Sequence, residues 1–147
     1  MKKIEHIGIA VRNLKDSNKV YESLLGSPPY KMEEVKSEGV RTSFFKICES
    51  KVELLEAINP ESTISKFIDK RGEGMHHIAF LVDDIESELL RLKKEGFVVL
   101  NETPKKGADN KWVTFLGLLP SRICCHRGGV WSGFRCLDIS PPKKSIS

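Results

Sequence analysis

Two histidines and one glutamate give the sequence its clearest chemical signal. His6 and His77 each stand at the head of a short apolar run, 71 positions apart. A single histidine in such a place is more often a satisfied core residue than a ligand. Two histidines at equivalent positions of a repeated pattern favour a pair of imidazole ligands, which suit zinc, cobalt, nickel or iron(II).

Glu53 offers a carboxylate for the same site. In a strand over residues 52–58, alternation places Glu53 on one face and Glu56 on the other. A carboxylate early in that strand can reach a metal held by the first strand, and a mixed shell of histidine and carboxylate suits a Lewis-acid site. We therefore predict His6, Glu53 and His77 as metal ligands. His76 must point to the other face of its strand, so a structural or exposed role is expected for it.

An internal repeat predicts the elements that position these residues. Residues 6–14 (HIGIAVRNL) align with residues 77–85 (HIAFLVDDI), and each copy reads as a buried strand that runs into a helix. Asn13 and Asp84 are expected N-caps, because their side-chain oxygens can accept orphan amide hydrogens of the first turn. Gly26 and Gly96 are expected to end the helices. The same offset matches residues 41–45 with 112–116, which both have strand composition.

The repeat predicts an α+β fold built from two β-α-β-β-β modules in a single domain of residues 1–147. Module one spans residues 1–58, a linker helix 59–74, module two 75–116, and a divergent tail 117–147. Within module one, residues 52–58 are expected to form a hairpin with residues 44–47. The linker is expected to hold its helix between Thr63 and Lys70.

The bulk composition excludes several classes of protein. The net charge of +4 comes from 24 basic and 20 acidic residues that are mixed along the chain, which disfavours nucleic acid as a partner. No apolar run approaches the roughly 20 residues of a spanning helix, so no membrane partner is expected. The four cysteines, three of them in the last quarter, form no disulfide framework. We therefore expect a cytoplasmic protein with reduced thiols.

Four motifs resemble one known superfamily: HIGIAV from residue 6, KVELL from 51, GMHHIAF from 74 and PKKGA from 104. They are similar to the vicinal oxygen chelate superfamily (glyoxalase, bleomycin resistance protein and dioxygenase), and within it to the methylmalonyl-CoA epimerase family. The resemblance covers about residues 4–116. It implies that the two modules pair into a curved, cup-shaped mixed sheet around one divalent ion, usually in a homodimer.

The resemblance also implies an activity. The protein would be an isomerase, a racemase or epimerase whose partner is an acyl-CoA substrate, and it would epimerise methylmalonyl-CoA by α-proton abstraction through a metal-chelated enolate. His6, Glu53 and His77 would hold the ion, with cobalt, zinc, nickel and manganese as candidates. The alternatives are a lactoylglutathione lyase-like isomerase or lyase, a non-haem iron dioxygenase-like protein, and a non-catalytic small-molecule binding protein of the same fold.

The tail departs from the family's pattern, in which a glutamate of the final strand is the fourth ligand and a base. No glutamate follows Glu102 in this chain. The repeat offset places Cys124 opposite Glu53, and Cys124, His126 and Asp138 are the local substitutes. The abrupt change of composition after Leu116 has two explanations, natural divergence or a shifted reading frame.

The acid and base residues are unknown at this stage. Some family members carry a carboxylate on the strand that matches residues 39–44. This chain has Thr42 there, and a hydroxyl with no activating neighbour is a poor base.

Overall fold

The computed structural model describes residues 1–106, 111–117 and 137–139, which form two compact units. The first unit is residues 5–77, and the second contains residues 1–4 with the described residues from 78 onward. The elements up to the second unit are β1 (Lys3–Val11), α1 (Leu14–Leu25), β2 (Lys31–Val35), the 3-10 helix η1 (Lys36–Glu38), β3 (Val40–Ile47), β4 (Ser50–Ala57), α2 (Thr63–Arg71) and β5 (Gly74–Leu81). The predicted single domain and its module boundaries stay predictions.

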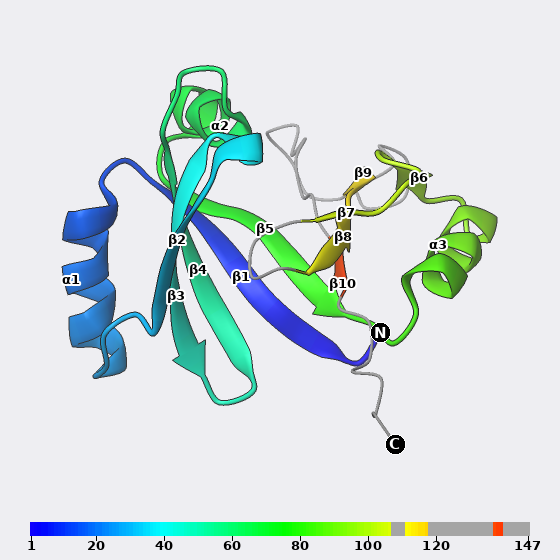
Figure 1. Ribbon diagram of the computed structural model, residues 1–147, viewed down its shortest axis with the longest axis horizontal. Helices are drawn as coiled ribbons and strands as arrows, with labels where there is room; N and C mark the ends of the chain where they lie inside the picture. Colours follow the sequence, from blue (N-terminus) through cyan, green and yellow to red (C-terminus); the bar gives the residue numbers. More distant parts are fainter. Residues whose placement is uncertain (107–110, 118–136, 140–147) are drawn as a thin grey trace, which may run out of the picture. The chain divides into compact units, whose positions relative to one another are not determined.

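A mixed sheet forms the framework of the first unit, with the strand order β2-β3-β4-β1-β5 (Figure 1). Strands β2, β3 and β4 pair antiparallel, whereas β1 lies parallel to β4. The β3–β4 hairpin is the one predicted from the sequence, although both strands are longer than expected. The run β1-α1-β2-β3-β4 is therefore a β-α-β-β-β module, as predicted.

The register decides which side chains share a face of this sheet. Gly8 is the Cα partner of Glu53 in β4, and Glu53 is the partner of Phe44 in β3. Partners across neighbouring strands point to the same face, and successive residues point to opposite faces. The face of Glu53 therefore also carries Gly8, Phe44 and the residues two positions away.

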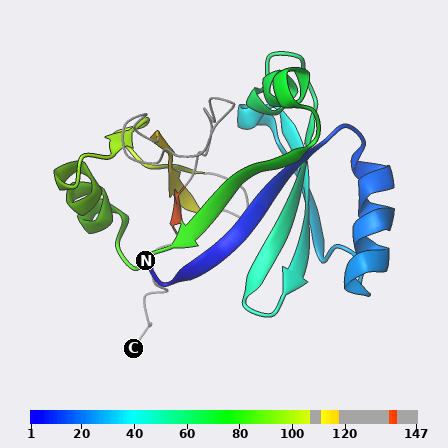
Figure 2. The same ribbon diagram turned by 180° about the vertical axis from the view of Figure 1, so that it is seen from behind.

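Each face is covered by a different helix (Figures 1 and 2). On one face α1 packs against the sheet through Leu14, Tyr21 and Leu25, around the buried Phe45 and Leu54. The opposite face carries α2. Its cluster contains Ala10, Val40, Leu55, Ile64 and Ile68. Because α2 packs near Leu55, it covers the end of the face that carries Glu53.

The second unit has α3 (Ile85–Lys94) and the short strands β6 (Val98–Val99), β7 (Lys105–Lys106), β8 (Trp112–Thr114), β9 (Leu116–Gly117) and β10 (Leu137–Ile139). Val82, Leu92 and Leu116 form its buried cluster. Strands β7, β8 and β10 form one small sheet, and β6 pairs with β9 in another. The segment 112–116, predicted as one strand, is thus divided between two sheets.

The predicted helix ends agree with the structure in most details. Asn13 accepts a hydrogen bond from the amide of Asp16, and Asp84 accepts from Glu86 and Ser87. Gly26 caps α1 in the left-handed conformation, with φ of 73°. In α3, however, the C-cap is Glu95, and Gly96 is the next residue, with φ of 85°.

The linker helix α2 is also confirmed, with Ser62 as its N-cap. No helix in the described part of the chain is both long and apolar enough to span a membrane.

Gly8 allows a close approach between β1 and β5. It is buried in β1, and a Cβ atom built there would overlap the imidazole ring of His77. The ring therefore occupies the space that any other residue at position 8 would fill. This contact requires glycine for its missing side chain rather than for its backbone freedom.

We predict that Gly8→Ala will destabilise the fold, because the added methyl group forces the His77 ring to move. The expected loss of unfolding free energy is about 1–3 kcal/mol, the usual cost of overpacking, and urea unfolding measures it. Gly117→Ala is the control. A Cβ there meets the flexible end of Leu100 at 3.2 Å, so little change is expected. Equal effects of the two substitutions would contradict the close approach.

Candidate metal centre

The three predicted ligands come together on the β4-β1-β5 side of the five-stranded sheet. His6 lies on β1, Glu53 on β4 and His77 on β5, and these strands are neighbours in the order β4-β1-β5. His6 Nε2 is 2.9 Å from His77 Nε2 and 3.2 Å from Glu53 Oε2, and His77 Nε2 is 3.5 Å from the same oxygen. The pattern-based prediction therefore selected three side chains that converge on one point.

The convergence point is shielded from solvent. Glu53, His6 and His77 are 3%, 6% and 7% exposed, respectively. Burial by itself raises the pKa of the Glu53 carboxyl, but hydrogen bonds and charges of His6 and His77 outweigh burial and lower that pKa from 4.5 to about 2. Glu53 is therefore a charged carboxylate at neutral pH, with two imidazoles as its partners.

The donor set fits a divalent metal ion. Ligand atoms held about 2.1 Å from one ion lie roughly 3.0–3.4 Å apart at octahedral to tetrahedral angles. The observed separations between the three donor atoms run from 2.9 to 3.5 Å. Two imidazoles and one carboxylate are also the ligand types that borderline divalent metals prefer. The triad is therefore consistent with a divalent metal site.

The ring nitrogens that face away from this point have partners of their own. His6 Nδ1 lies 2.6 Å from Glu5 Oε2, and Lys51 Nζ lies 2.6 Å from the other oxygen of Glu5. His77 Nδ1 lies 2.9 Å from Nδ1 of His76, whose ring packs edge-on against Phe67. His76 is thus partly buried and contacts His77.

Sequence reasoning did not identify Glu5 and Lys51. The sequence signal was weak: Glu5 stands directly before a predicted ligand, and a lysine stands two residues before Glu53. Strand alternation argued against a contact between Glu5 and His6. That rule concerns the direction of the Cβ atoms, and a glutamate is long enough to reach the nitrogen nearest to its neighbour's backbone.

Thr42 is fully buried on the face of the sheet that carries Glu53. It is the Cα partner of Leu55, two positions from Glu53. Among the described residues its hydroxyl has no hydrogen-bond partner. Within residues 1–106, 111–117 and 137–139, no group hydrogen-bonds the Thr42 hydroxyl in a way that could activate it as a base.

The predicted substitutes for the fourth ligand lie in the last part of the chain. Cys124 and His126 lie outside the described residues. Asp138 belongs to β10, where its Cα partner is Val113 of β8. Their expected role as substitutes for the missing glutamate stays a prediction.

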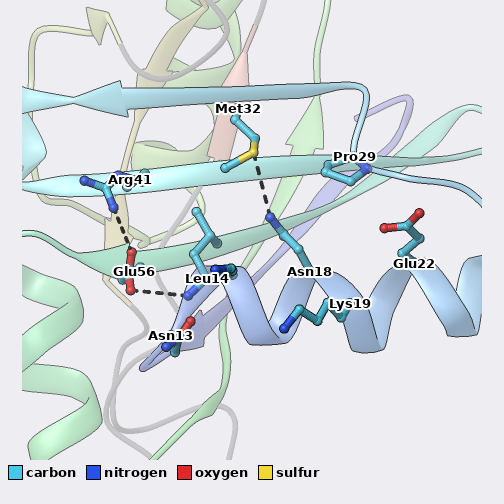
Figure 3. A pocket seen from close by; sticks show the side chains of 10 residues that line it. Asn13, Leu14, Asn18, Lys19, Glu22, Pro29, Met32, Arg41 and Glu56 are labelled. Atoms are coloured by element: carbon cyan, nitrogen blue, oxygen red, sulfur yellow. Dashed lines mark hydrogen bonds and ion pairs between the residues drawn. The ribbon is translucent and has the colours of Figure 1, made fainter.

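A separate hollow lies beside the first turns of α1, on the face opposite to Glu53 (Figure 3). Its polar groups contact one another: Glu56 accepts hydrogen bonds from the Leu14 amide and from Arg41. Asn18 accepts a hydrogen bond from Ser43 and donates one to Met32. These contacts provide an acceptor for the Leu14 amide in the first turn of α1 and hold the helix against the sheet. The polar groups of the hollow therefore have a structural role.

Comparison with known proteins identifies relatives over most of the chain. Residues 5–115 match the family model of the Glyoxalase/Bleomycin resistance protein/Dioxygenase superfamily. The uncharacterized protein YqjC of Bacillus subtilis is 34% identical over 116 residues, which are 79% of this chain and 83% of that protein. The mitochondrial methylmalonyl-CoA epimerase of Dictyostelium discoideum is 35% identical over 115 residues, or 78% of this chain and 69% of the relative.

Solved structures that are similar to this chain come from the same kinds of protein. The hypothetical protein BH1468 of Bacillus halodurans superposes with a TM-score of 0.81 at 38% identity, covering 99% of this chain and 97% of that one. A variant of the Streptomyces coelicolor methylmalonyl-CoA epimerase, in complex with 2-nitronate-propionyl-CoA, gives 0.80 at 30% identity, covering 95% and 98%. The chain thus belongs to the Glyoxalase/Bleomycin resistance protein/Dioxygenase superfamily and has its α+β fold of β-α-β-β-β units.

Proposed function

We propose that this protein binds one divalent metal ion through His6, Glu53 and His77 and acts as an isomerase on an acyl-CoA. The observation that carries the proposal is the buried convergence of two imidazoles and one charged carboxylate. Such a carboxylate is costly to bury without compensating charge, and a divalent ion would supply it. Cobalt, zinc, nickel and manganese are the candidate ions.

The proposed substrate is methylmalonyl-CoA. Support comes from the relatives: the chain is 30–35% identical to proteins named methylmalonyl-CoA epimerases. One solved relative holds 2-nitronate-propionyl-CoA, and another holds methylmalonyl-CoA with ammonium. The α-carbon of this substrate lies between a thioester and a carboxylate, so its proton is comparatively acidic.

The proposed chemistry is removal and return of the α-proton. A divalent ion at the triad would supply positive charge opposite the oxygen on which negative charge develops. His6, Glu53 and His77 would hold the ion in a site shielded from bulk water. Inversion at carbon also needs proton transfer on both faces. The proposal assigns no described residue to that transfer, because the Thr42 hydroxyl has no hydrogen-bond partner in the part of the chain that the structure describes.

A second candidate, iron(II)-dependent oxygen chemistry, is favoured by the donor set alone. Two histidines and one carboxylate form the ligand set of non-haem iron(II) oxygenases. Metal analysis of untagged protein separates the candidates: iron(II) as the bound ion, with oxygen uptake, would support the oxygenase.

We further propose a homodimer in the cytoplasm, which sedimentation and cell fractionation would test.

The first prediction from this proposal concerns the imidazoles. His77→Ala should abolish stoichiometric binding of zinc or cobalt, because the ion loses one of its three proposed ligands. His76→Ala should retain one ion per chain, because His76 contacts the Nδ1 atom of His77 and is not itself a proposed ligand. Calorimetric titration and elemental analysis measure the number of ions bound per chain in each variant. An equal loss of bound metal in the two variants would contradict the assignment of His77, and not His76, as a ligand.

Glu53 allows a graded test. Glu53→Gln should keep the fold and retain some binding, since an amide oxygen can still coordinate. Glu53→Ala should weaken affinity by a decade or more, which corresponds to about 1.4 kcal/mol. Glu56→Gln, on the opposite face of the same strand, is the control and should bind like the unmodified chain. Unchanged affinity in Glu53→Ala would remove Glu53 from the site.

The third prediction concerns the effect of the divergent tail, residues 117–147, on the rate of α-proton exchange. We predict that the chain binds cobalt or zinc weakly and exchanges the α-proton of methylmalonyl-CoA slowly or not at all in deuterated water, followed by proton NMR. A chimera with a Val-Glu-Leu-type strand after Leu116 should bind the ion more tightly and exchange readily, because it regains a carboxylate ligand and base. Turnover of the unmodified chain at roughly 1–1000 per second would contradict this account of the tail.

A further inference from the structure

Each histidine of the triad is contacted by the residue directly before it in the chain. Glu5 precedes His6, and its Oε2 lies 2.6 Å from the Nδ1 of that ring. His76 precedes His77, and the two Nδ1 atoms are 2.9 Å apart. In both rings Nδ1 is held while Nε2 faces the convergence point. The same local arrangement therefore occurs on both β1 and β5.

We propose that Glu5 and His76 are positioning residues that present the Nε2 lone pairs of His6 and His77 to the metal. The inference deepens the proposed metal centre and rests on it. It assigns a function to two residues that are not themselves ligands of the ion. Such outer partners fix the tautomer and orientation of a ligand ring.

The tautomer of His6 follows from the chemistry of its partner. An ionised carboxylate can only accept a hydrogen bond, so Nδ1 of His6 must carry the hydrogen that Glu5 accepts. In a neutral ring this leaves Nε2 without a proton and able to coordinate. Glu5 is 4% exposed, and Lys51 Nζ, 2.6 Å from its other oxygen, matches its charge. The contact between Glu5 and His6 is thus buried and charge-compensated, not an exposed surface contact.

His77 is arranged in a similar way with a neutral partner. If its Nε2 coordinates the ion, the ring carries its hydrogen on Nδ1 and donates it to Nδ1 of His76. His76 must then hold its own hydrogen on Nε2. Its ring is fixed edge-on against Phe67 of α2, with ring centroids 4.9 Å apart. Helix α2 thereby determines the orientation of His76, and His76 determines that of His77.

Two pairs of variants at His76 and Glu5 separate the hydrogen bond from mere packing. His76→Phe keeps a ring against Phe67 but removes the acceptor, whereas His76→Asn retains an oxygen near the position of Nδ1. Glu5→Leu removes the acceptor for His6, whereas Glu5→Gln retains one acceptor oxygen. Glu56→Gln is the control, since it also removes the charge of an ion-paired glutamate, but on the face of β4 opposite to Glu53.

The readout is the affinity for zinc, measured by calorimetry and by competition with a chromophoric chelator. We expect His76→Phe and Glu5→Leu to weaken binding by about 10–100-fold, the usual effect of removing an outer partner. His76→Asn should recover most of the affinity, and Glu5→Gln should lie between Glu5→Leu and the unmodified chain. Unchanged affinity in His76→Phe and in Glu5→Leu, with binding intact in the unmodified chain, would overturn the proposal.

A second readout requires no metal. The chain has four histidines, so ¹⁵N-detected NMR of the metal-free protein can resolve the tautomer of each imidazole. We expect His6 to carry its hydrogen on Nδ1 in the unmodified chain and in Glu5→Gln. His6 protonated on Nε2 alone in the unmodified chain would overturn the role of Glu5.

The two readouts distinguish a failure of this inference from a failure of the proposed function. If the unmodified chain binds no divalent ion, the metal centre is wrong, and the His6 tautomer still decides whether Glu5 orients that ring. If the chain binds zinc but neither partner affects affinity, the metal centre stands and the positioning role does not. Thermal unfolding followed by circular dichroism checks that each variant is folded.

Discussion

The charge of Glu53 in the interior of the first unit is the constraint on which the rest of the site depends. An uncompensated buried carboxylate costs several kcal/mol, so the fold must bring partners to it. Both partners are imidazoles, and they come from strands that lie next to β4 and β1 in the sheet. The strand order that places β1 between β4 and β5 therefore makes this charge tolerable, and it also brings together three candidate metal donors.

The sequence predicted that His6, Glu53 and His77 belong to one site because two patterns agreed. The repeat identified His6 and His77 as equivalent, and strand alternation chose Glu53 over Glu56. Strand alternation follows from backbone geometry and the repeat from internal sequence similarity, and both can be read from residue spacing. The hairpin of β3 and β4 and the caps at Asn13 and Asp84 were predictable for the same reason, since each depends on residues close in sequence.

Other features could not be predicted because they depend on the reach of individual side chains or on pairing between distant segments. Glu5 contacts His6 although their Cβ atoms point to opposite faces of β1. The strand predicted over 112–116 is divided because its first part pairs with β7 and β10 and its last part with β6. Composition within that segment gives no indication of the change of partner.

The close approach at Gly8 also distinguishes the two copies of the repeat. The offset of 71 residues that relates His6 to His77 also relates Gly8 to Ala79, which is fully buried and carries the methyl group that Gly8 must lack. The two copies are therefore alike at the histidine and differ two residues later, because β1 has to leave room for the His77 ring at Gly8. The two copies are therefore not equivalent at this position, because a Cβ atom in β1 would overlap the His77 ring, whereas β5 carries its Cβ atom at Ala79.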